Sequence, residues 1–320
     1  MSRCREKGRS RAVYHCDLRE SLTFWRHRLT MPTFSVFPYR GRFAPSPTGL
    51  LHQGSLFCAM ATWLDARAHD GTWLIRIEDI DPFRDIPGAG DAILRTLADF
   101  GLTSDEPVVR QSERLELYAA ALKTLEDRHR AYGCACTSHE IKAEDARLGL
   151  LAGVYPGTCR YGTHGRPVRS HRFLTEDRVI TFTDRRLGQQ EQNVEKDVGD
   201  FVLKRADGCW AYQLAVVVDD AAQGVTDVVR GEDLLTSTAR QIELQEALGY
   251  PTPRYLHIGL ILGEDGEKLS KQRKAPEITS DDPLGLLEKL WPHFGFSPLG
   301  ADTLDAFWKE AVRCWKERWA

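Results

Sequence analysis

Residues 42–55 read RFAPSPTGLLHQGS, between a strand-like segment at 36–43 and an apolar helical segment at 52–68. Prolines end the strand, and Gly49 and Gly54 have no Cβ to hold a flat or anionic ligand away from the backbone. His52 stands at the start of the helix, where free N–H groups favour phosphate. The stretch therefore predicts a nucleotide site at the end of a strand, although a Pro/Gly turn with a surface histidine would look similar.

Strand-like and helical segments alternate through the rest of the chain. Further strands are expected at 73–77, 212–218, 225–229 and 255–262, and further helices at 87–100, 112–130, 234–248, 284–291 and 304–315. This order predicts an α/β fold with a Rossmann-like, doubly wound parallel sheet, whose ligand binds at the carboxyl ends of the strands. Residues 166–208 are polar and irregular, which indicates an inserted subdomain of short strands.

Composition excludes several classes of protein. The 320 residues include 42% hydrophobic and 28% charged residues, which is typical of a globular chain and not of a disordered one. The apolar runs are too short to cross a bilayer, so no membrane partner is expected. The formal net charge of −3 means that any nucleic-acid surface must be local. No apolar signal segment begins the chain, so a reducing cytoplasm is the expected compartment.

A second candidate for phosphate binding follows the strand expected at 255–262. Residues 266–272 read GEKLSKQ, so Lys268, Ser270 and Lys271 lie in a loop that begins with glycine. Two lysines on such a loop can close on a triphosphate and offset its negative charge. An ordinary solvated loop is the alternative.

Charged side chains near the strand ends suggest an amino-acid pocket. Arg42 and Arg230 can each clamp a carboxylate, Glu78 can accept from an ammonium group, and Tyr212 can donate a hydrogen bond. A ligand with two carboxylates and one ammonium fits this set, which predicts glutamate and leaves aspartate open. A plain ion-pair network of Arg76 with its acidic neighbours is the alternative.

Three cysteines, Cys134, Cys136 and Cys159, lie close together in the sequence. Thiolates are preferred zinc ligands, and a tetrahedral site needs a fourth donor. His139, His164 and Tyr155 are the candidates, and three buried thiols without a metal are the alternative reading. The arginines that follow, between Arg160 and Arg186, form either a solvated face or a contact for RNA.

Residues 42–55 and 266–272 together resemble the two signatures of class I aminoacyl-tRNA synthetases, in their glutamyl branch. The usual His-x-Gly-His has Ser55 in its last place, which is similar to the stand-alone glutamyl-queuosine tRNA(Asp) synthetases. The resemblance implies catalytic roles for His52 and Lys271. It also implies a glutamate-binding set, an ATP-binding set and a structural zinc site. The glutamate set is Arg42, Ala44, Ser46, Glu78, Tyr212 and Arg230; the ATP set is His52, Gly54, Ser55, Lys268, Ser270 and Lys271; the zinc ligands are Cys134, Cys136, Tyr155 and Cys159.

The same resemblance implies the activity and the domain organisation. ATP with Mg²⁺ would convert glutamate to its adenylate without tRNA, and a hydroxyl of queuosine in the tRNA(Asp) anticodon would then take the glutamate. The alternatives are an enzyme that charges a tRNA 3′ end with glutamate or glutamine, and an inactive zinc- or RNA-binding module. We expect a monomer with an N-terminal extension (1–35), a divided catalytic domain (36–130 and 209–275), an inserted zinc-bearing subdomain (131–208) and a helical region (276–320). The residues after Lys271 are too few for an anticodon-binding domain.

Overall fold

The computed structural model describes residues 38–150, 153–261 and 277–320. The extension expected at 1–35 and the loop with Lys268, Ser270 and Lys271 lie outside these described residues. Pro38–Ala320 forms one compact unit. No helix in the described ranges combines the length and the apolar character that a membrane span requires.

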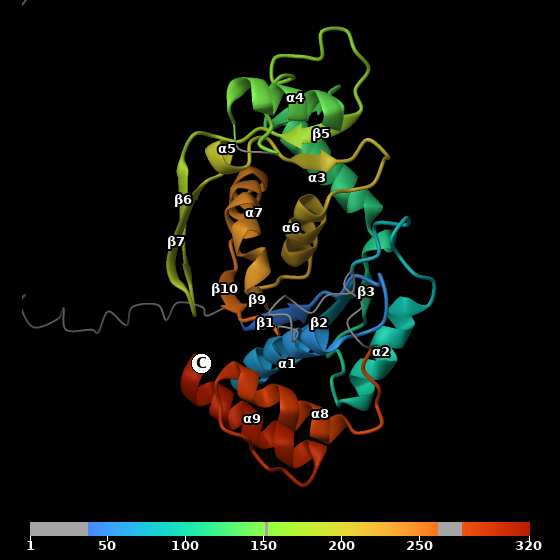
Figure 1. Cartoon of the computed structure of the whole chain (residues 1–320), viewed down its shortest axis with the longest axis vertical. Coiled ribbons are helices and arrows are strands. Elements are labelled where there is room, and N and C mark those ends of the chain that lie inside the picture. The colour runs from blue at the N-terminus through green and yellow to red at the C-terminus, as the bar shows by residue number, and fades with distance from the viewer. Residues whose placement is uncertain (1–37, 151–152, 262–276) are drawn as a thin grey trace, which may run out of the picture. The chain divides into compact units, whose positions relative to one another are not determined.

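Two groups of parallel strands form the centre of the fold (Figure 1). In the first group β1 (Arg40–Phe43) pairs with β2 (Thr72–Ile77), which pairs with β3 (Val109–Arg110). In the second group β9 (Asp227–Gly231) pairs with β10 (Arg254–Ile258). The two groups adjoin because the backbone N–H of Thr226 donates to the carbonyl of Arg40 at 3.0 Å. The carboxyl ends of β1 and β9 therefore lie next to each other, at the position where a parallel sheet binds its ligand.

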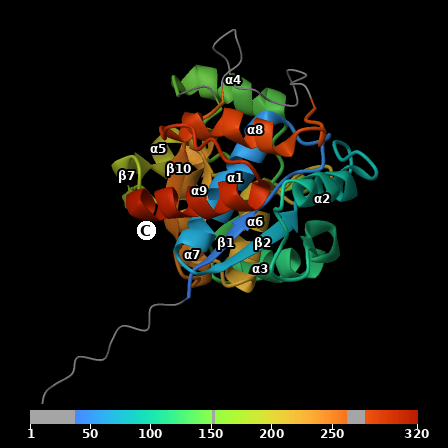
Figure 2. The same ribbon diagram turned by 90° about the horizontal axis from the view of Figure 1, so that it is seen from below.

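Helices cover both faces of these strands. The helices α1 (Gln53–Ala68), α8 (Pro283–Leu290) and α9 (Leu304–Trp319) lie on one face, and α6 (Tyr212–Ala222) and α7 (Leu235–Leu248) lie on the other (Figures 1 and 2). Two further helices, α2 (Ala89–Asp99) and α3 (Leu115–Asp127), follow β2 and β3. Short 3₁₀ helices occupy Gln111–Glu113, Glu232–Leu234 and Trp291–Phe294.

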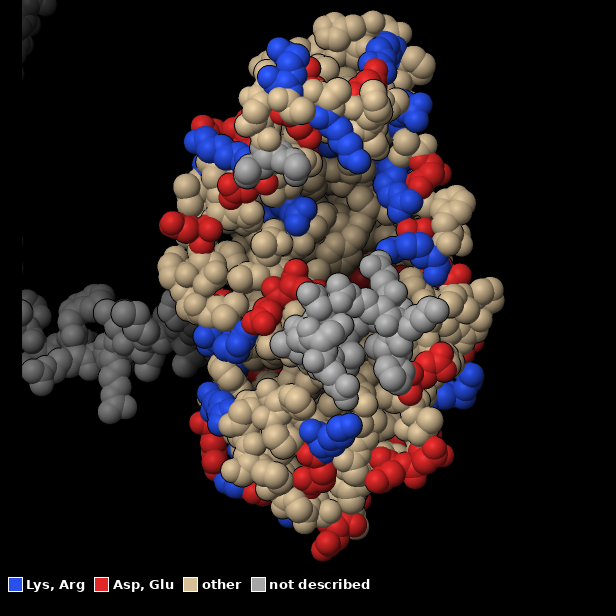
Figure 3. All heavy atoms as spheres, in the orientation of Figure 1, with Lys and Arg blue, Asp and Glu red and all other residues tan. Residues whose placement is uncertain are grey.

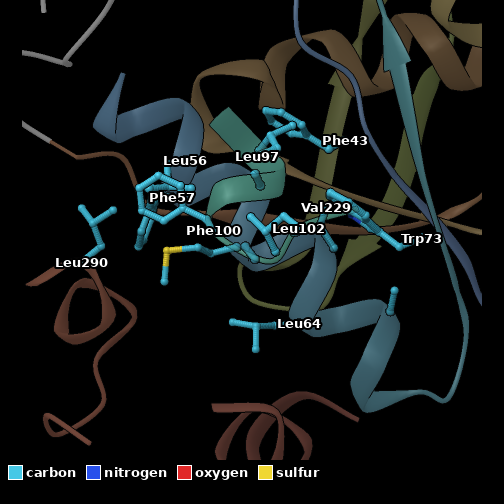
Figure 4. Packing of buried hydrophobic residues seen from close by; sticks show 14 of the residues in the cluster. Phe43, Leu56, Phe57, Leu64, Trp73, Leu97, Phe100, Leu102, Val229 and Leu290 are labelled. Atoms are coloured by element: carbon cyan, nitrogen blue, oxygen red, sulfur yellow. The ribbon is translucent and has the colours of Figure 1, made fainter. Parts of the chain in front are cut away.

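The main hydrophobic core lies between the strands and the face with α1. Leu56 and Leu64 of α1 are fully buried, and Trp73 of β2 and Phe100 after α2 pack into the same cluster (Figure 4). Trp315 of α9 is also buried there, and its indole N–H donates to Asp65 at 2.9 Å. The helical C-terminal region therefore belongs to the same hydrophobic core, because removing α9 would expose this apolar face of α1.

The inserted region forms one small sheet of its own and adds a hairpin to the sheet of β9 and β10. The small sheet is antiparallel and consists of β4 (Ala131–Cys134), β5 (Ser170–Phe173) and β8 (Val202–Lys204). The hairpin consists of β6 (Val179–Asp184) and β7 (Gly188–Asn193), and Asp184 of β6 lies in parallel register with Tyr255 of β10. The helices α4 (Ser138–Leu148) and α5 (Val194–Asp197) complete the region. The hairpin thus extends the catalytic strands.

The strand predicted at 212–218 is wrong, because this segment is the helix α6. Leu214 through Val218 are all buried, since α6 packs against α7 on one side and α3 on another. A short apolar run that is buried all round has no visible period, so periodicity cannot separate a strand from a helix there. Asp219 and Asp220 continue the same helix and are also buried.

Candidate active site

A cavity of about 420 Å³ opens at the carboxyl ends of β1, β2, β9 and β10, beside the N-termini of α1 and α6. Apart from the three residues outside the described ranges, it brings together every side chain that the sequence assigned to glutamate or ATP. The lining includes Arg42, Ala44, Ser46, His52, Gly54, Ser55, Glu78, Tyr212 and Arg230.

The end of β1 supplies Arg42, and α6 supplies its partner. The Nε atom of Arg42 donates to Oδ1 of Asp220 at 3.0 Å, and Nη2 of Arg76 reaches the same oxygen at 2.9 Å. Burial by itself would raise the pKa of Asp220, but the two guanidinium groups hold that pKa below its usual value. Asp220 is therefore an ionised anchor that fixes Arg42 at the cavity wall.

Glu78 follows β2 and is buried at the same wall. Nη2 of Arg76 donates to Oε1 of Glu78 at 3.3 Å, so the ion pair considered as an alternative is present. Burial raises the pKa of Glu78, although Arg76 and Arg42 oppose the rise. A ligand ammonium would favour the ionised form of this carboxylate. Asp79, by contrast, accepts from the backbone N–H and the hydroxyl of Ser112.

The end of β9 supplies Arg230, which is 3% exposed. Its Nε donates to Nε2 of His257 at 3.1 Å, Nη1 to Oε1 of Gln241 at 2.7 Å, and Nη2 to Oγ1 of Thr238 at 2.8 Å. Tyr212 begins α6, and burial raises the pKa of its phenol. Its hydroxyl therefore stays protonated and can donate.

His52 occupies the N-cap of α1. Its Nδ1 accepts from the backbone N–H of Ser55 at 3.3 Å, and Oγ of Ser55 lies 3.0 Å from Nε2. Because Nδ1 accepts, the neutral ring carries its proton on Nε2. Ser55, at the place of the usual second histidine, thus holds the imidazole at a helix end that favours phosphate.

A second candidate site, for a metal, lies in the inserted region. The sulfurs of Cys134, Cys136 and Cys159 lie within 4.8 Å of one another, and Cys136 and Cys159 are 3.6 Å apart. The Tyr155 hydroxyl is 3.3 Å from the sulfur of Cys134 and 3.6 Å from that of Cys136. Tetrahedral zinc with ordinary bond lengths would separate two sulfurs by about 3.8 Å and a sulfur and an oxygen by about 3.5 Å. The four side chains therefore fit a zinc ion.

The thiols of this cluster differ in their ionisation. Burial opposes ionisation of Cys134, but Tyr155 and Arg172 lower the pKa of this thiol to about 7, whereas burial and the neighbouring thiols raise the pKa of Cys136 to about 11. The guanidinium of Arg172 lies over the Tyr155 ring, 3.8 Å from its centroid. Within the described residues, neither His139 nor His164 joins the group of potential ligands, so Tyr155 is the fourth candidate that the fold brings to the thiols.

Several arginines of the basic run after Cys159 are engaged inside the protein. Arg160 binds Asp200 and Glu195, Arg185 binds Asp65, and Arg172 donates to the carbonyl of Asp200. These side chains stabilise the inserted region and its junction with α1. These three arginines are buried or half-buried and contribute little to a solvated face, whereas Arg166 and Arg169 of the same run are exposed.

A comparison with families of known proteins assigns this fold. The family described as "tRNA synthetases class I (E and Q), catalytic domain" matches residues 39–159 and 165–284. A protein of Burkholderia cenocepacia called "Glutamyl-Q tRNA(Asp) synthetase" is 55% identical over 290 residues, which are 88% of this chain and 97% of that protein. This chain belongs to the glutamyl-Q tRNA(Asp) synthetase family.

Other members of the glutamyl-Q tRNA(Asp) synthetase family are similarly close. The protein of that name from Ralstonia nicotianae is 52% identical over 88% of this chain and 92% of its own length. Among solved structures, a glutamate tRNA ligase from Elizabethkingia meningosepticum, in complex with its amino acid, has a TM-score of 0.65 and 32% identity. That match covers 73% of this chain and 52% of the ligase, so this chain spans about half of that protein's length.

The sequence did not identify the residues that hold the two arginines at the cavity wall of this chain. Asp220 carried a signal, because two adjacent aspartates end an apolar run and buried carboxylates need partners. Nothing in the sequence indicated a role for Thr238, Gln241 and His257. Ordinary polar residues on a helix and a strand are compatible with a solvated surface.

Proposed function

We propose that this chain activates L-glutamate with ATP, without tRNA, and transfers the glutamate to the queuosine base in the anticodon of tRNA(Asp). The near full-length similarity to relatives called glutamyl-Q tRNA(Asp) synthetase carries this proposal. The cavity supports it, because it combines two arginines, a buried carboxylate and a histidine at a helix N-terminus.

Glutamate fits the charged wall of the cavity. Arg42 and Arg230 receive its two carboxylates, and Glu78 accepts from its ammonium group. Tyr212 donates a hydrogen bond to the bound amino acid. Ala44 and Ser46 belong to the same wall, at the turn after β1, and leave room for the ligand.

ATP fits the N-terminus of α1. Gly54 and Ser55 supply the first turn of the helix, and His52 faces the α-phosphate. A carboxylate oxygen of glutamate attacks the α-phosphorus in line, and the bond to the pyrophosphate oxygen breaks. The imidazole stabilises the charge that develops. Lys268, Ser270 and Lys271, which lie outside the described residues, are assigned to the same phosphates by the resemblance alone.

In the second step a hydroxyl of the queuosine ring attacks the carbonyl carbon of the adenylate, and AMP leaves. Figure 3 supports access for a large acceptor: the face shown there is hollowed below the region of α4 and β5, and Lys and Arg side chains lie around the hollow.

Two metal ions belong to this proposal. Mg²⁺ bound with ATP would neutralise charge on the departing pyrophosphate. Cys134, Cys136, Tyr155 and Cys159 would hold one Zn²⁺ as a closed structural site, because the four donors leave no open position.

The test is glutamate transfer onto tRNA from cells that make queuosine and from cells that cannot. We expect labelled glutamate only on the first tRNA, and nuclease mapping should place it in the anticodon. Label on the 3′ adenosine would show instead an enzyme that charges the acceptor end. Glutamate-dependent ATP–pyrophosphate exchange without tRNA is also expected, and its absence would point to an inactive module.

A further inference from the structure

The two arginines at the cavity differ in how their charges are compensated. Arg42 is paired with the carboxylate of Asp220. The three side chains that receive the N–H groups of Arg230 are an imidazole, an amide and a hydroxyl. Among the residues that the structure describes, no carboxylate forms an ion pair with Arg230. A buried guanidinium held by neutral acceptors retains its full positive charge for a ligand.

The buried carboxylate of Asp184 contacts His257 on the side of the ring away from Arg230. Oδ2 of Asp184, at the end of β6, is 2.7 Å from Nδ1 of His257 and accepts from the backbone N–H of His257 at 3.0 Å. Oδ1 accepts from the backbone N–H groups of Arg186 and Leu187 at 3.0 and 2.9 Å. Burial would raise the pKa of Asp184, but the contacts with His257 and these N–H groups hold that pKa below its usual value.

These contacts fix the state of the imidazole. Because an ionised Asp184 accepts from Nδ1, the proton of neutral His257 lies on Nδ1. Nε2 then presents its lone pair to the Nε–H of Arg230, 3.1 Å away. The chain Asp184–His257–Arg230 therefore runs from the inserted hairpin to the cavity wall, and each bond in it has one donor and one acceptor.

We propose that Asp184 and His257 are positioning residues that aim the Arg230 guanidinium at a carboxylate of the amino-acid substrate. This inference rests on the proposed function, which assigns a substrate carboxylate to Arg230. It also gives the β6–β7 hairpin a role in amino-acid binding, since the hairpin supplies the carboxylate that sets the tautomer of His257.

The arrangement has a consequence for pH. The charged groups that face His257 are Asp184 from β6, Arg186 from the turn after β6 and Arg230 from β9. Burial lowers the pKa of His257, Asp184 opposes this effect and Arg230 adds to it; the net shift is downward, so the ring is neutral at pH 7. If Nε2 of His257 took up a proton, it could no longer accept the hydrogen bond from the Nε–H of Arg230. The KM for glutamate should therefore rise in acid, below the ordinary histidine pKa of about 6.5.

ATP–pyrophosphate exchange at several pH values tests the proposal. Asp184→Asn and His257→Ala should each raise the KM for glutamate about tenfold, the effect of one good hydrogen bond, with the KM for ATP unchanged. His257→Gln places an amide oxygen near the position of Nε2 and cannot take up a proton. It should restore most of the affinity and remove the rise of KM in acid. Asp177→Asn, on an exposed aspartate that pairs with Lys196, is the matched control and should behave as the wild type.

Two results would overturn the proposal. One is an unchanged KM for glutamate in Asp184→Asn and His257→Ala. The other is an equal loss for glutamate and ATP together with early thermal unfolding, which indicates a purely structural role. Calorimetric titration with glutamate separates this inference from the proposed function. Weaker binding in the two variants supports the inference even if the wild type transfers nothing to tRNA, and no binding by the wild type overturns both.

Discussion

Arg42 and Asp220 are 178 residues apart in the sequence, yet Nε of Arg42 lies 3.0 Å from Oδ1 of Asp220. Both side chains are almost completely buried, and Arg76 binds the same carboxylate. One aspartate on α6 therefore fixes two arginines that arrive from β1 and β2. This contact joins the strands β1 and β2 to the helix α6 at the wall of the cavity.

Asp220→Asn should lower the free energy of unfolding by about 3–5 kcal/mol, because it leaves buried guanidinium charge uncompensated. Urea denaturation measures the loss. Since the pKa of Asp220 is depressed, its contribution is complete above the unfolded aspartate pKa of about 3.9 and disappears as the pH falls through the folded-state value. The difference between wild type and variant should therefore be constant from pH 5 to 8 and shrink in stronger acid.

The control is Glu106→Gln, which removes an exposed ion pair with Arg40. It should lower the free energy of unfolding by less than about 1 kcal/mol. Equal costs for the two variants would contradict this account.

His52→Asn should lower the rate of glutamate-dependent ATP–pyrophosphate exchange about 10²–10³-fold, since it removes the imidazole beside the α-phosphate. Asparagine is itself a good N-cap, so α1 should keep its stability and the thermal midpoint should stay near the wild-type value. His52→Ala removes both the imidazole and the N-cap of α1. It should therefore lower the exchange rate and also lower the free energy of unfolding by about 1 kcal/mol. Near-normal exchange by His52→Asn would remove His52 from the catalytic residues.

Purified wild-type protein should contain one zinc ion per chain, and Cys136→Ser should lose it, as measured by atomic emission. Tyr155→Phe should weaken the affinity for zinc and keep the packing of Arg172 against the ring. Cys209→Ser, on a half-buried cysteine outside the cluster, is the control and should retain the metal. Full zinc content in Cys136→Ser would exclude the proposed ligand set.

Glu243 provides a test of pH dependence in the junction between α7 and the inserted region. Burial raises the pKa of Glu243 to about 7, even though Arg130 lies 3.3 Å away, and its Oε2 has no hydrogen-bond partner within the described part of the chain. Because the unfolded pKa is about 4.3, the unfolded state loses its proton first, and stability falls as the pH rises from there to about 7. The free energy of unfolding of the wild type should therefore fall by roughly 2 kcal/mol between pH 5 and pH 8. That of Glu243→Gln lacks this fall, so the variant gains stability relative to the wild type over this range. Urea denaturation at these two pH values measures the change, and a gain in the opposite direction would refute the buried protonated state.

The sequence predicted which described side chains line the cavity. His52 at a helix start, the arginines at two strand ends and Glu78 after β2 all line one cavity, because parallel strands deliver their carboxyl ends to one edge. It predicted most of the strands and helices outside the inserted region as well, but it predicted a strand in place of α6 and missed β3 and α4. The first part of the helix α6 is apolar on all sides, and its two buried aspartates are held by arginines from other elements, with Tyr118 as a further donor to Asp219.

Local sequence by itself determined most of the strands and helices, the Pro/Gly turn after β1 and the spacing of the thiols, since each depends on neighbouring residues. The tertiary structure alone decided which side chains hold the arginines. Asp220 reaches Arg42 across 178 residues, and Asp184 reaches Arg230 through His257 because β6 is parallel to β10. Electrostatic contacts of this kind depend on distance and burial in space, and no pattern along the chain encodes either quantity.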